Sequence, residues 1–371
     1  MEKGADKAPR KDPSLSVESY HAMQRPETGN QQEEVEDHLS HTLPFVLVCC
    51  ITLLGSGGLI IGVGPFIERM VKDGYFSDRC NDRESGCAEQ YDAMNPIFNG
   101  GFQIMTWTSA ITGILLTAWG PRYNATIGMI FLTIGCGILA TAETEDGPNF
   151  FMMGYGFIGG GGNLMYISSF HFANLFENKA VPIGILGGIF NLSGLLFMLL
   201  NIPGVTIKIF FSGYSFVGMG LVVLVAIFYP DDSIEDGEGY SLKFPTYSHV
   251  SCSRVYQEIC RPEVFKAVKS TRFLGFCVLF AWCTMSNVVI GGLVESLAAS
   301  KSSDSDSLHI FNGYAYPIIG NSTFLFAPMV GYLIQETGFA LSMTFCIVFT
   351  QISLALCWGP ELVSQYFMLF F

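Results

Sequence analysis

The chain has 371 residues, half of them hydrophobic, and only 14% carry a charged side chain. Its mean hydropathy of +0.41 and its 41 glycines are typical of helical membrane bundles, in which small residues let helix backbones approach closely. The net charge of −13 does not fit a basic nucleic-acid surface, and acidic runs such as 33–37 and 231–236 are typical of solvated segments.

Residues 1–42 are polar, rich in Glu, Pro, Ser and Lys, and contain no apolar h-region. They are therefore predicted to be a disordered cytoplasmic tail and not a cleaved signal peptide. Nine apolar stretches follow, each long enough to cross a hydrocarbon core about 30 Å thick. These stretches are 43–66, 97–119, 124–141, 150–176, 181–201, 209–229, 273–299, 309–334 and 339–358. The pattern predicts an all-α, multi-pass integral membrane protein.

The spacing of the stretches divides the chain. We expect an N-terminal six-helix half at 43–229, a cytoplasmic inter-half loop at 230–271, and an incomplete C-terminal half at 272–371. That last part has three spans and the start of a fourth, which begins near Leu362. About two thirds of the 19 Lys and Arg fall on the side of the N-terminal tail, which predicts a cytoplasmic N-terminus. The plasma membrane is the expected location.

Several short elements are more specific than hydropathy. They are 53–58, 62–66, Tyr75-Phe76, Cys80 and Cys87 with 90–92, Gly120-Pro121-Arg122, 159–162, Asn174-Leu175-Phe176, 188–193 and 327–332. These elements resemble the major facilitator superfamily, and within it solute carrier family forty-three. That branch holds L-type amino-acid transporters and an equilibrative nucleobase transporter. The resemblance implies a major facilitator fold, in which two six-helix halves enclose a central cavity.

The chain departs from the family pattern at its gate. The acid of the family's first-helix motif is replaced by Gly55, and the acid of the inner-loop motif appears as Thr117. In the family such acids cap helix ends and pair with arginine. The inner-loop motif here is therefore represented by Thr117, Gly120, Pro121 and Arg122. Its altered chemistry predicts a weaker gate, a rewired gate or no transport.

Polar side chains near the middle of several spans are the candidate substrate site. An amide at that depth loses its water and must find a partner, so it faces protein or a wet cavity. The alternative is that these groups only bond neighbouring helices and stabilise the bundle. The candidate substrate-binding residues are Ser56, Gln103, Asn163, Asn191, Ser193, Asn287 and Asn321, with Gln103 about one and a half turns from its span's midpoint.

The predicted function is facilitative uniport of a small neutral solute by alternating access. Among the residues of the spans only His171, Glu295 and His309 can ionise, so no proton relay is expected at depth. The resemblance implies large neutral amino acids as substrates, with nucleobases as the alternative. A non-transporting receptor or partner subunit derived from a carrier, and a fragment of a longer gene, both stay open.

No catalytic residue, cofactor or metal site is expected, because no nucleophile–base pair and no cluster with metal-ligand spacing is visible. The glycines at 159–162 lie inside a span and are predicted to allow close helix packing rather than to bind phosphate. Cys80 and Cys87 share the predicted outer loop and match a cysteine pair of the family. We expect a disulfide between them, with two free thiols as the alternative.

Overall fold

A computed structural model describes residues 28–80, 87–232, 234, 240, 252–301, 307, 310–356 and 358–359. Every regular element in these residues is helical. The α-helices are α2 (Thr28–Gly55), α3 (Val63–Lys72), α4 (Ala88–Trp119), α5 (Pro121–Thr141), α6 (Pro148–Ser169), α7 (Ala180–Ser193), α8 (Ile207–Phe228), α9 (Cys252–Ile259), α10 (Pro262–Val268), α11 (Thr271–Lys301), α13 (Tyr316–Gly320), α14 (Thr323–Thr337) and α15 (Phe339–Leu356). The other helical segments are the 3-10 helices η2 (Gly57–Gly62), η3 (Ser77–Arg79), η4 (Phe170–Leu175) and η5 (Gly194–Asn201), and the π-helix η7 (Phe311–Ala315).

Six described helical segments are long and apolar enough to cross a membrane, and the chain is an integral membrane protein. They are His41–Lys72, Pro121–Thr141, Ala180–Asn201, Ile207–Phe228, Ile318–Thr337 and Phe339–Leu356. The other three predicted spans, 97–119, 150–176 and 273–299, lie on α4, α6 with η4, and α11. These segments are helical but do not belong to the set of six, and within α11 the stretch Thr271–Ser286 is apolar but shorter than a spanning helix.

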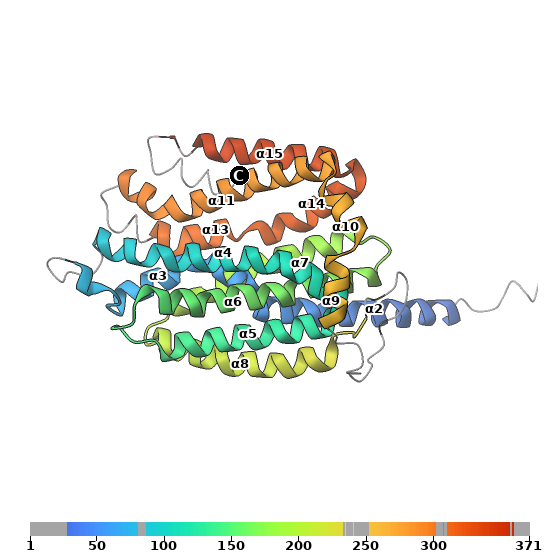
Figure 1. Cartoon of the computed structure of the whole chain (residues 1–371), viewed down its shortest axis with the longest axis horizontal. Coiled ribbons are helices and arrows are strands. Elements are labelled where there is room, and N and C mark those ends of the chain that lie inside the picture. The colour runs from blue at the N-terminus through green and yellow to red at the C-terminus, as the bar shows by residue number, and fades with distance from the viewer. Residues whose placement is uncertain are drawn as a thin grey trace, which may run out of the picture.

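The long helices lie side by side as a bundle, and their chain order defines its two ends (Figure 1). At one end α4 turns into α5 through Gly120, which we call the Gly120 end. At the other end the disulfide between Cys80 and Cys87 joins the segments before α4, which we call the disulfide end. The Cα atoms of this pair are 5.9 Å apart, so the predicted pairing is confirmed.

The N-terminal helices pack through glycines that leave no room for side chains. The glycines at 159–162 face three neighbours: a Cβ on Gly161 would lie 2.4 Å from the carbonyl oxygen of Gly128 on α5, and one on Gly162 would lie 2.3 Å from the amide nitrogen of Gly57. A Cβ on Gly160 would contact Thr108 of α4 at 3.0 Å. The predicted role of these glycines in close packing is therefore confirmed. Helix α6 packs against α4, α5 and η2.

The C-terminal helices contact the N-terminal ones mainly where α14 crosses α7. A Cβ on Gly184 of α7 would lie 2.6 Å from the carbonyl oxygen of Ala327. A Cβ on Gly331 of α14 would lie 2.5 Å from the carbonyl oxygen of Ala180. Backbone lies on backbone along this interface, which we call the α7–α14 seam. It joins the two parts of the chain that the sequence divides at 230–271.

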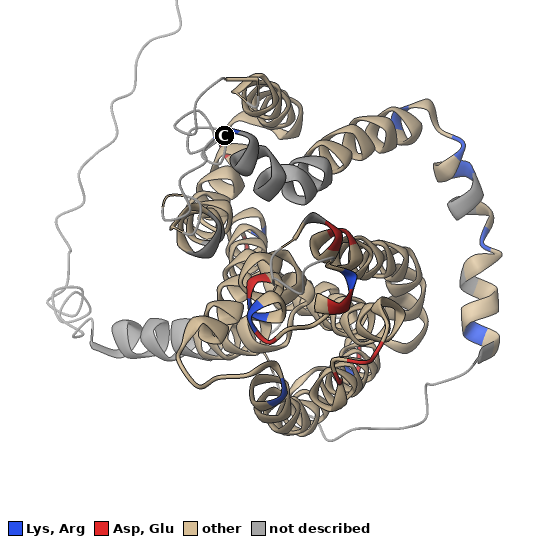
Figure 2. Ribbon diagram, turned by 90° about the vertical axis from the view of Figure 1, so that its left-hand side faces the viewer, with Lys and Arg blue, Asp and Glu red and all other residues tan. Residues whose placement is uncertain are grey.

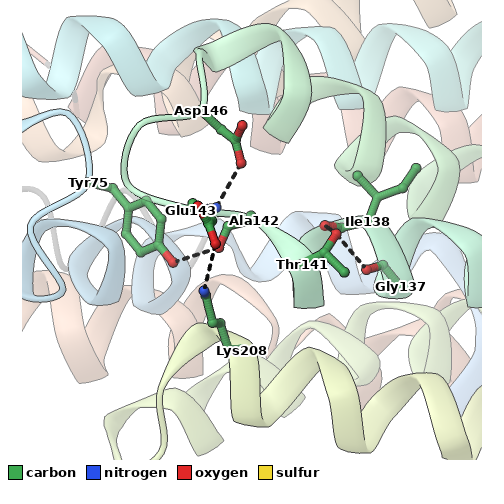
Figure 3. A network of polar contacts seen from close by, with 8 residues as sticks. All are labelled: Tyr75, Gly137, Ile138, Thr141, Ala142, Glu143, Asp146 and Lys208. Carbon is green, nitrogen blue, oxygen red and sulfur yellow. Dashed lines mark hydrogen bonds and ion pairs between the residues drawn. The ribbon is translucent and has the colours of Figure 1, made fainter.

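A polar network closes the disulfide end (Figure 3). The hydroxyl of Tyr75 donates to the carbonyl of Ala142 at 3.4 Å, and the carboxylate of Asp146 accepts from the amide of Glu143 at 2.8 Å. Lys208, at the start of α8, lies 3.9 Å from the carboxylate of Glu143. Burial, and after it the nearby carboxylates, raises the pKa of Tyr75, so its hydroxyl stays a donor.

Two regions differ from the predicted organisation. Helix α2 begins at Thr28, so the predicted disordered tail at 1–42 is helical from that residue onward. The predicted loop at 230–271 contains α9 and α10, which run across the bundle at its Gly120 end (Figure 1). Residues 1–27 and 360–371, including the predicted start of a tenth span, lie outside the described residues.

Candidate functional site

Four of the predicted spans break or change helix type within their length. One is 150–176, where η4 follows α6, and the other three bear on the candidate site. Between α2 and η2, Ser56 has an extended backbone with φ −82° and ψ 156°. The α-helix of α7 ends at Ser193, and the 3-10 helix η5 continues from Gly194. In the eighth predicted span, a turn at Asn321 and Ser322 separates α13 from α14. Interrupted helices free backbone groups inside a membrane, and such groups are tolerated only where protein or a cavity satisfies them.

The first two interruptions are joined by a hydrogen bond between serines. The hydroxyl of Ser56 donates to the hydroxyl of Ser193 at 2.9 Å, and Ser193 donates in turn to the carbonyl of Phe190 at 2.7 Å. Both serines are fully buried. A Cβ on Gly58 would lie 1.7 Å from that same carbonyl oxygen, so η2 lies directly on the end of α7.

The third interruption meets the other two at Gly194. A Cβ on Gly194 would lie 2.8 Å from Oδ1 of Asn321 and 3.1 Å from the amide nitrogen of Gly62. Asn321 is 3% exposed. Because Gly194 follows Ser193 directly, the buried Asn321 lies beside the residue next to the serine pair. We call Ser56, Ser193 and Asn321 the junction cluster.

The other predicted substrate residues lie elsewhere. Asn163 donates from Nδ2 to Oγ of Ser109 at 2.7 Å and to the carbonyl of Met105 at 3.3 Å, so it ties α6 to α4. The half-buried Asn191 donates to the carbonyl of Gly187 in its own helix at 3.0 Å. Gln103 is exposed on α4. Asn287 lies in α11, and its side chain is outside the described residues.

The gate residues form a second polar cluster at the Gly120 end. Gly120 has a φ of +83°, and a Cβ there would lie 1.9 Å from the carbonyl oxygen of Asp231, which follows α8. Pro121 begins α5, and the amide of Arg122 donates to the carbonyl of Pro230 at 3.0 Å. The turn between α4 and α5 is thus fitted closely against the segment that leaves α8.

Arg122 pairs with an acid that the sequence analysis did not assign. Its Nη1 lies 2.9 Å from Oδ1 of Asp231, and its Nε donates to the carbonyl of Tyr229. The side chains are 3% and 12% exposed. Thr117, a predicted gate residue, is exposed and donates to the carbonyl of Gly113 in its own helix. The acidic partner of Arg122 is Asp231, in the segment that leaves α8.

This pairing corrects one interpretation of the sequence. The run 231–236 was expected to be solvated, yet the side chain of Asp231 is largely covered and pairs with Arg122, while Asp232 is exposed. The available signal was positional, since Asp231 directly follows the sixth predicted span, at the end where the Gly120 turn must lie. Tyr240 adds to the cluster by donating to the carbonyl of Phe228, and burial raises the pKa of Tyr240 to about 12.

A cavity of about 330 Å³ lies beside this cluster. Its lining includes the end of α4, the Gly120 turn, His171, Asp232 and Arg254 of α9. Because Arg254 contributes to the lining, α9 contacts the same end of the bundle as the buried Arg122–Asp231 pair. The cavity has mixed charge, with one acid and one permanent base in its wall.

Comparison with known proteins gives two distant relatives, while no protein-family model matches the chain. Over 201 residues, 51% of this chain, it is 24% identical to Protein FMP42 of Saccharomyces cerevisiae. Over 215 residues, 54% of this chain, it is 24% identical to the aromatic and large neutral amino acid transporter 5-3 of Toxoplasma gondii. These matches cover 40% and 42% of the relatives, so the chain spans about two fifths of their length.

The comparisons and the fold together define a class. The chain is an all-α integral membrane protein with apolar helices of spanning length, and one of its distant relatives carries the name of an amino-acid transporter.

Proposed function

We propose that this protein is a facilitator-type carrier that moves a small neutral solute across the membrane by uniport, with large neutral amino acids as the leading substrate class. The major facilitator arrangement, and the likeness to solute carrier family forty-three within it, belong to this proposal. The name of the Toxoplasma gondii relative supports the substrate class. The N-terminus is proposed to be cytoplasmic, which places the Gly120 end inside the cell.

The junction cluster is the observation that carries the proposal. Carriers place their substrate sites near the bilayer midplane, where interrupted helices offer backbone and side-chain groups. Here three interruptions meet at Ser56, Ser193 and Asn321, all of them buried. Hydroxyl and amide groups suit a zwitterion or a nucleobase edge, because neither ligand requires a full countercharge.

Alternating access then corresponds to opening of the α7–α14 seam. In the present structure the serines bond each other at 2.9 Å and Asn321 lies against Gly194. These side chains fill the space that a substrate would take, so this is the closed arrangement. Movement of α14 away from α7 separates Asn321 from the serine pair and exposes all three groups to the solute. Gln103, Asn163, Asn191 and Asn287 stay proposed contacts of the wider cavity.

Arg122, part of the gate proposed from the sequence, has Asp231 as its partner. Arg122 and Asp231 both belong to the N-terminal helices, so their ion pair holds α5 to α8 within one half. It thereby keeps the Gly120 turn rigid while the seam opens. A gate that is rewired in this way does not require the family's acid at Thr117.

Uptake into proteoliposomes tests the proposal. The purified chain is reconstituted, and entry of labelled leucine, phenylalanine and a purine base is compared with entry into protein-free vesicles. We expect amino-acid uptake that equilibrates without concentrating the solute and that does not change with a protonophore. Uptake of the purine alone would make nucleobases the substrate class in place of amino acids. No uptake of any solute would favour the non-transporting alternative and overturn the proposal.

Variants of the junction cluster sharpen this test. Ser56→Ala and Asn321→Ala each remove a hydrogen-bonding group, which costs about 0.5–1.5 kcal/mol and thus roughly 2- to 10-fold in affinity. Thr344→Ala is the matched control, because its hydroxyl bonds only to Ala340 in its own helix on the exposed α15. Parental uptake kinetics in both junction variants would remove the cluster from the substrate site.

A further inference from the structure

The segment from α9 to the start of α11 is strongly basic in an acidic protein. Five exposed bases, Arg254, Arg261, Lys266, Lys269 and Arg272, lie within it, while the whole chain has a net charge of −13. The same stretch contains two acids, Glu258 and Glu263. Figure 2 shows the bases spaced along α9 and α10, at the rim of the bundle. We call residues 252–273 the basic rim.

Apolar side chains alternate with these bases and are also exposed. Tyr256 is 70% exposed, Ile259 46%, Val268 50% and Phe273 43%. In α9 the residues Val255 and Ile259 are four apart and share one helix face, and Arg254 points away from that face. Arg261 follows the end of the helix at Ile259. Short helices with one apolar and one basic face are the elements that lie in a membrane interface.

The position of the basic rim agrees with that role. Helices α9 and α10 run across the direction of the long helices, at the end of the bundle where α4 stops (Figure 1). A helix that crosses the end of membrane-spanning helices lies in the plane of the membrane surface. Arg254 and Trp119 line one cavity there, and aromatic residues such as tryptophan concentrate at the headgroup level.

We propose that the basic rim binds the headgroups of anionic phospholipids in the cytoplasmic leaflet, with phosphatidylserine as the reference ligand. The inference rests on the proposed topology, which places the Gly120 end inside the cell, where anionic lipids are concentrated. The exposed apolar side chains favour lipid over a soluble acidic partner, because acyl chains bury them while the bases contact phosphate. Each base near such a surface is worth roughly five-fold in binding.

Binding has a structural consequence at the gate. Arg254 of α9 lines the cavity that also includes the Gly120 turn. A lipid that fixes α9 at the membrane surface therefore supports the turn that positions Arg122. Bound lipid thus stabilises the Gly120 end.

Native mass spectrometry of the full chain in detergent tests this inference. The chain is titrated with phosphatidylserine or with phosphatidylcholine of the same acyl chains, and the bound fraction is measured. We expect at least ten-fold tighter binding of phosphatidylserine, and a loss of that preference in Lys266→Gln/Lys269→Gln/Arg272→Gln. Equal binding of the two lipids overturns the inference.

A control variant distinguishes an effect of the basic rim from an effect of the protein's net charge. Lys72→Gln/Lys179→Gln/Lys208→Gln removes the same charge from three other loops or helix ends, and we expect less than a two-fold change in lipid preference. A drop equal to that of the basic-rim variant overturns the inference, as does tighter binding of polyglutamate than of phosphatidylserine. Labelling of Lys266→Cys from outside intact cells overturns the topology and the lipid assignment together. Uptake is not the readout, so failure here leaves the transport proposal standing.

Discussion

Replacing Arg122 by Met breaks the buried ion pair at the Gly120 end and leaves Asp231 without its guanidinium. The two side chains are 3% and 12% exposed, and their charged atoms are 2.9 Å apart. Removing one partner of such a pair costs about 3–5 kcal/mol, because an uncompensated charge stays buried. We expect this loss in unfolding free energy for Arg122→Met and a similar one for Asp231→Asn.

The same two helices supply a matched control at the disulfide end. Lys208, at the start of α8, lies 3.9 Å from Glu143, which follows α5, and these side chains are 51% and 70% exposed. Exposed ion pairs contribute about 0–1 kcal/mol. Lys208→Met therefore changes stability by no more than about 1 kcal/mol, although it too removes one base from an α5–α8 ion pair.

The assay is unfolding by SDS in mixed micelles, followed by circular dichroism. The double variant Arg122→Met/Asp231→Asn is expected to lose less stability than the sum of its single variants, by at least about 1 kcal/mol, since neither charge then lacks its partner. Additive losses, or a loss in Arg122→Met no larger than in Lys208→Met, would refute the assignment of Asp231 as the partner of Arg122.

Three further predictions concern packing and the disulfide. Cys80→Ser opens a disulfide of sequence separation 7 and should cost about 2–3 kcal/mol, with dithiothreitol lowering the Tm of the parent but not of the variant. Gly62→Ala places a Cβ 1.9 Å from a carbonyl oxygen of η5 and should cost about 1–3 kcal/mol in SDS unfolding, whereas Gly113→Ala meets nothing within 4 Å and should be neutral. Asn163→Ala breaks the tie between α6 and α4 and should lower the Tm by the equivalent of about 1–3 kcal/mol. If Asn163→Ala instead changed substrate preference at parental stability, Asn163 would belong to the substrate site.

The sequence predicted the elements that depend on local composition. Long apolar stretches identify spanning helices because a stretch of about 20 apolar residues is stable in the hydrocarbon core wherever it occurs in the chain. The close packing at 159–162 and the pairing of Cys80 with Cys87 were likewise predicted, since the glycines lie within one span and the cysteines within one loop. One interpretation that failed at the Gly120 end concerned Asp231, whose burial depends on Arg122, over a hundred residues away in the chain.

The junction cluster was only partly predicted, for a related reason. Depth along a span selected Ser56, Ser193 and Asn321, which lie at the three interruptions, but it also selected Asn163 and Asn191, which bond elsewhere. That these residues bind substrate stays a prediction. Depth does not specify which way a side chain points around the helix. The interruptions at Ser56 and Gly194 change that direction, and hydropathy averaged over a span does not register them. The helices α9 and α10 were missed because each is shorter than the window in which amphipathic periodicity is apparent.

The 3-10 segment η2 also sets the rotational phase of the first span. A 3-10 helix turns through 120° per residue and rises 2.0 Å, whereas an α-helix turns through 100° and rises 1.5 Å. Over the six residues of η2 the difference accumulates to about 120° and about 3 Å. Phe66 stacks on Tyr155 at 5.4 Å and on Phe197 at 5.7 Å between ring centroids. Conversion of η2 to α-helix would swing Phe66 a third of a turn out of this stack, so the winding of six residues is coupled to the aromatic packing beyond them.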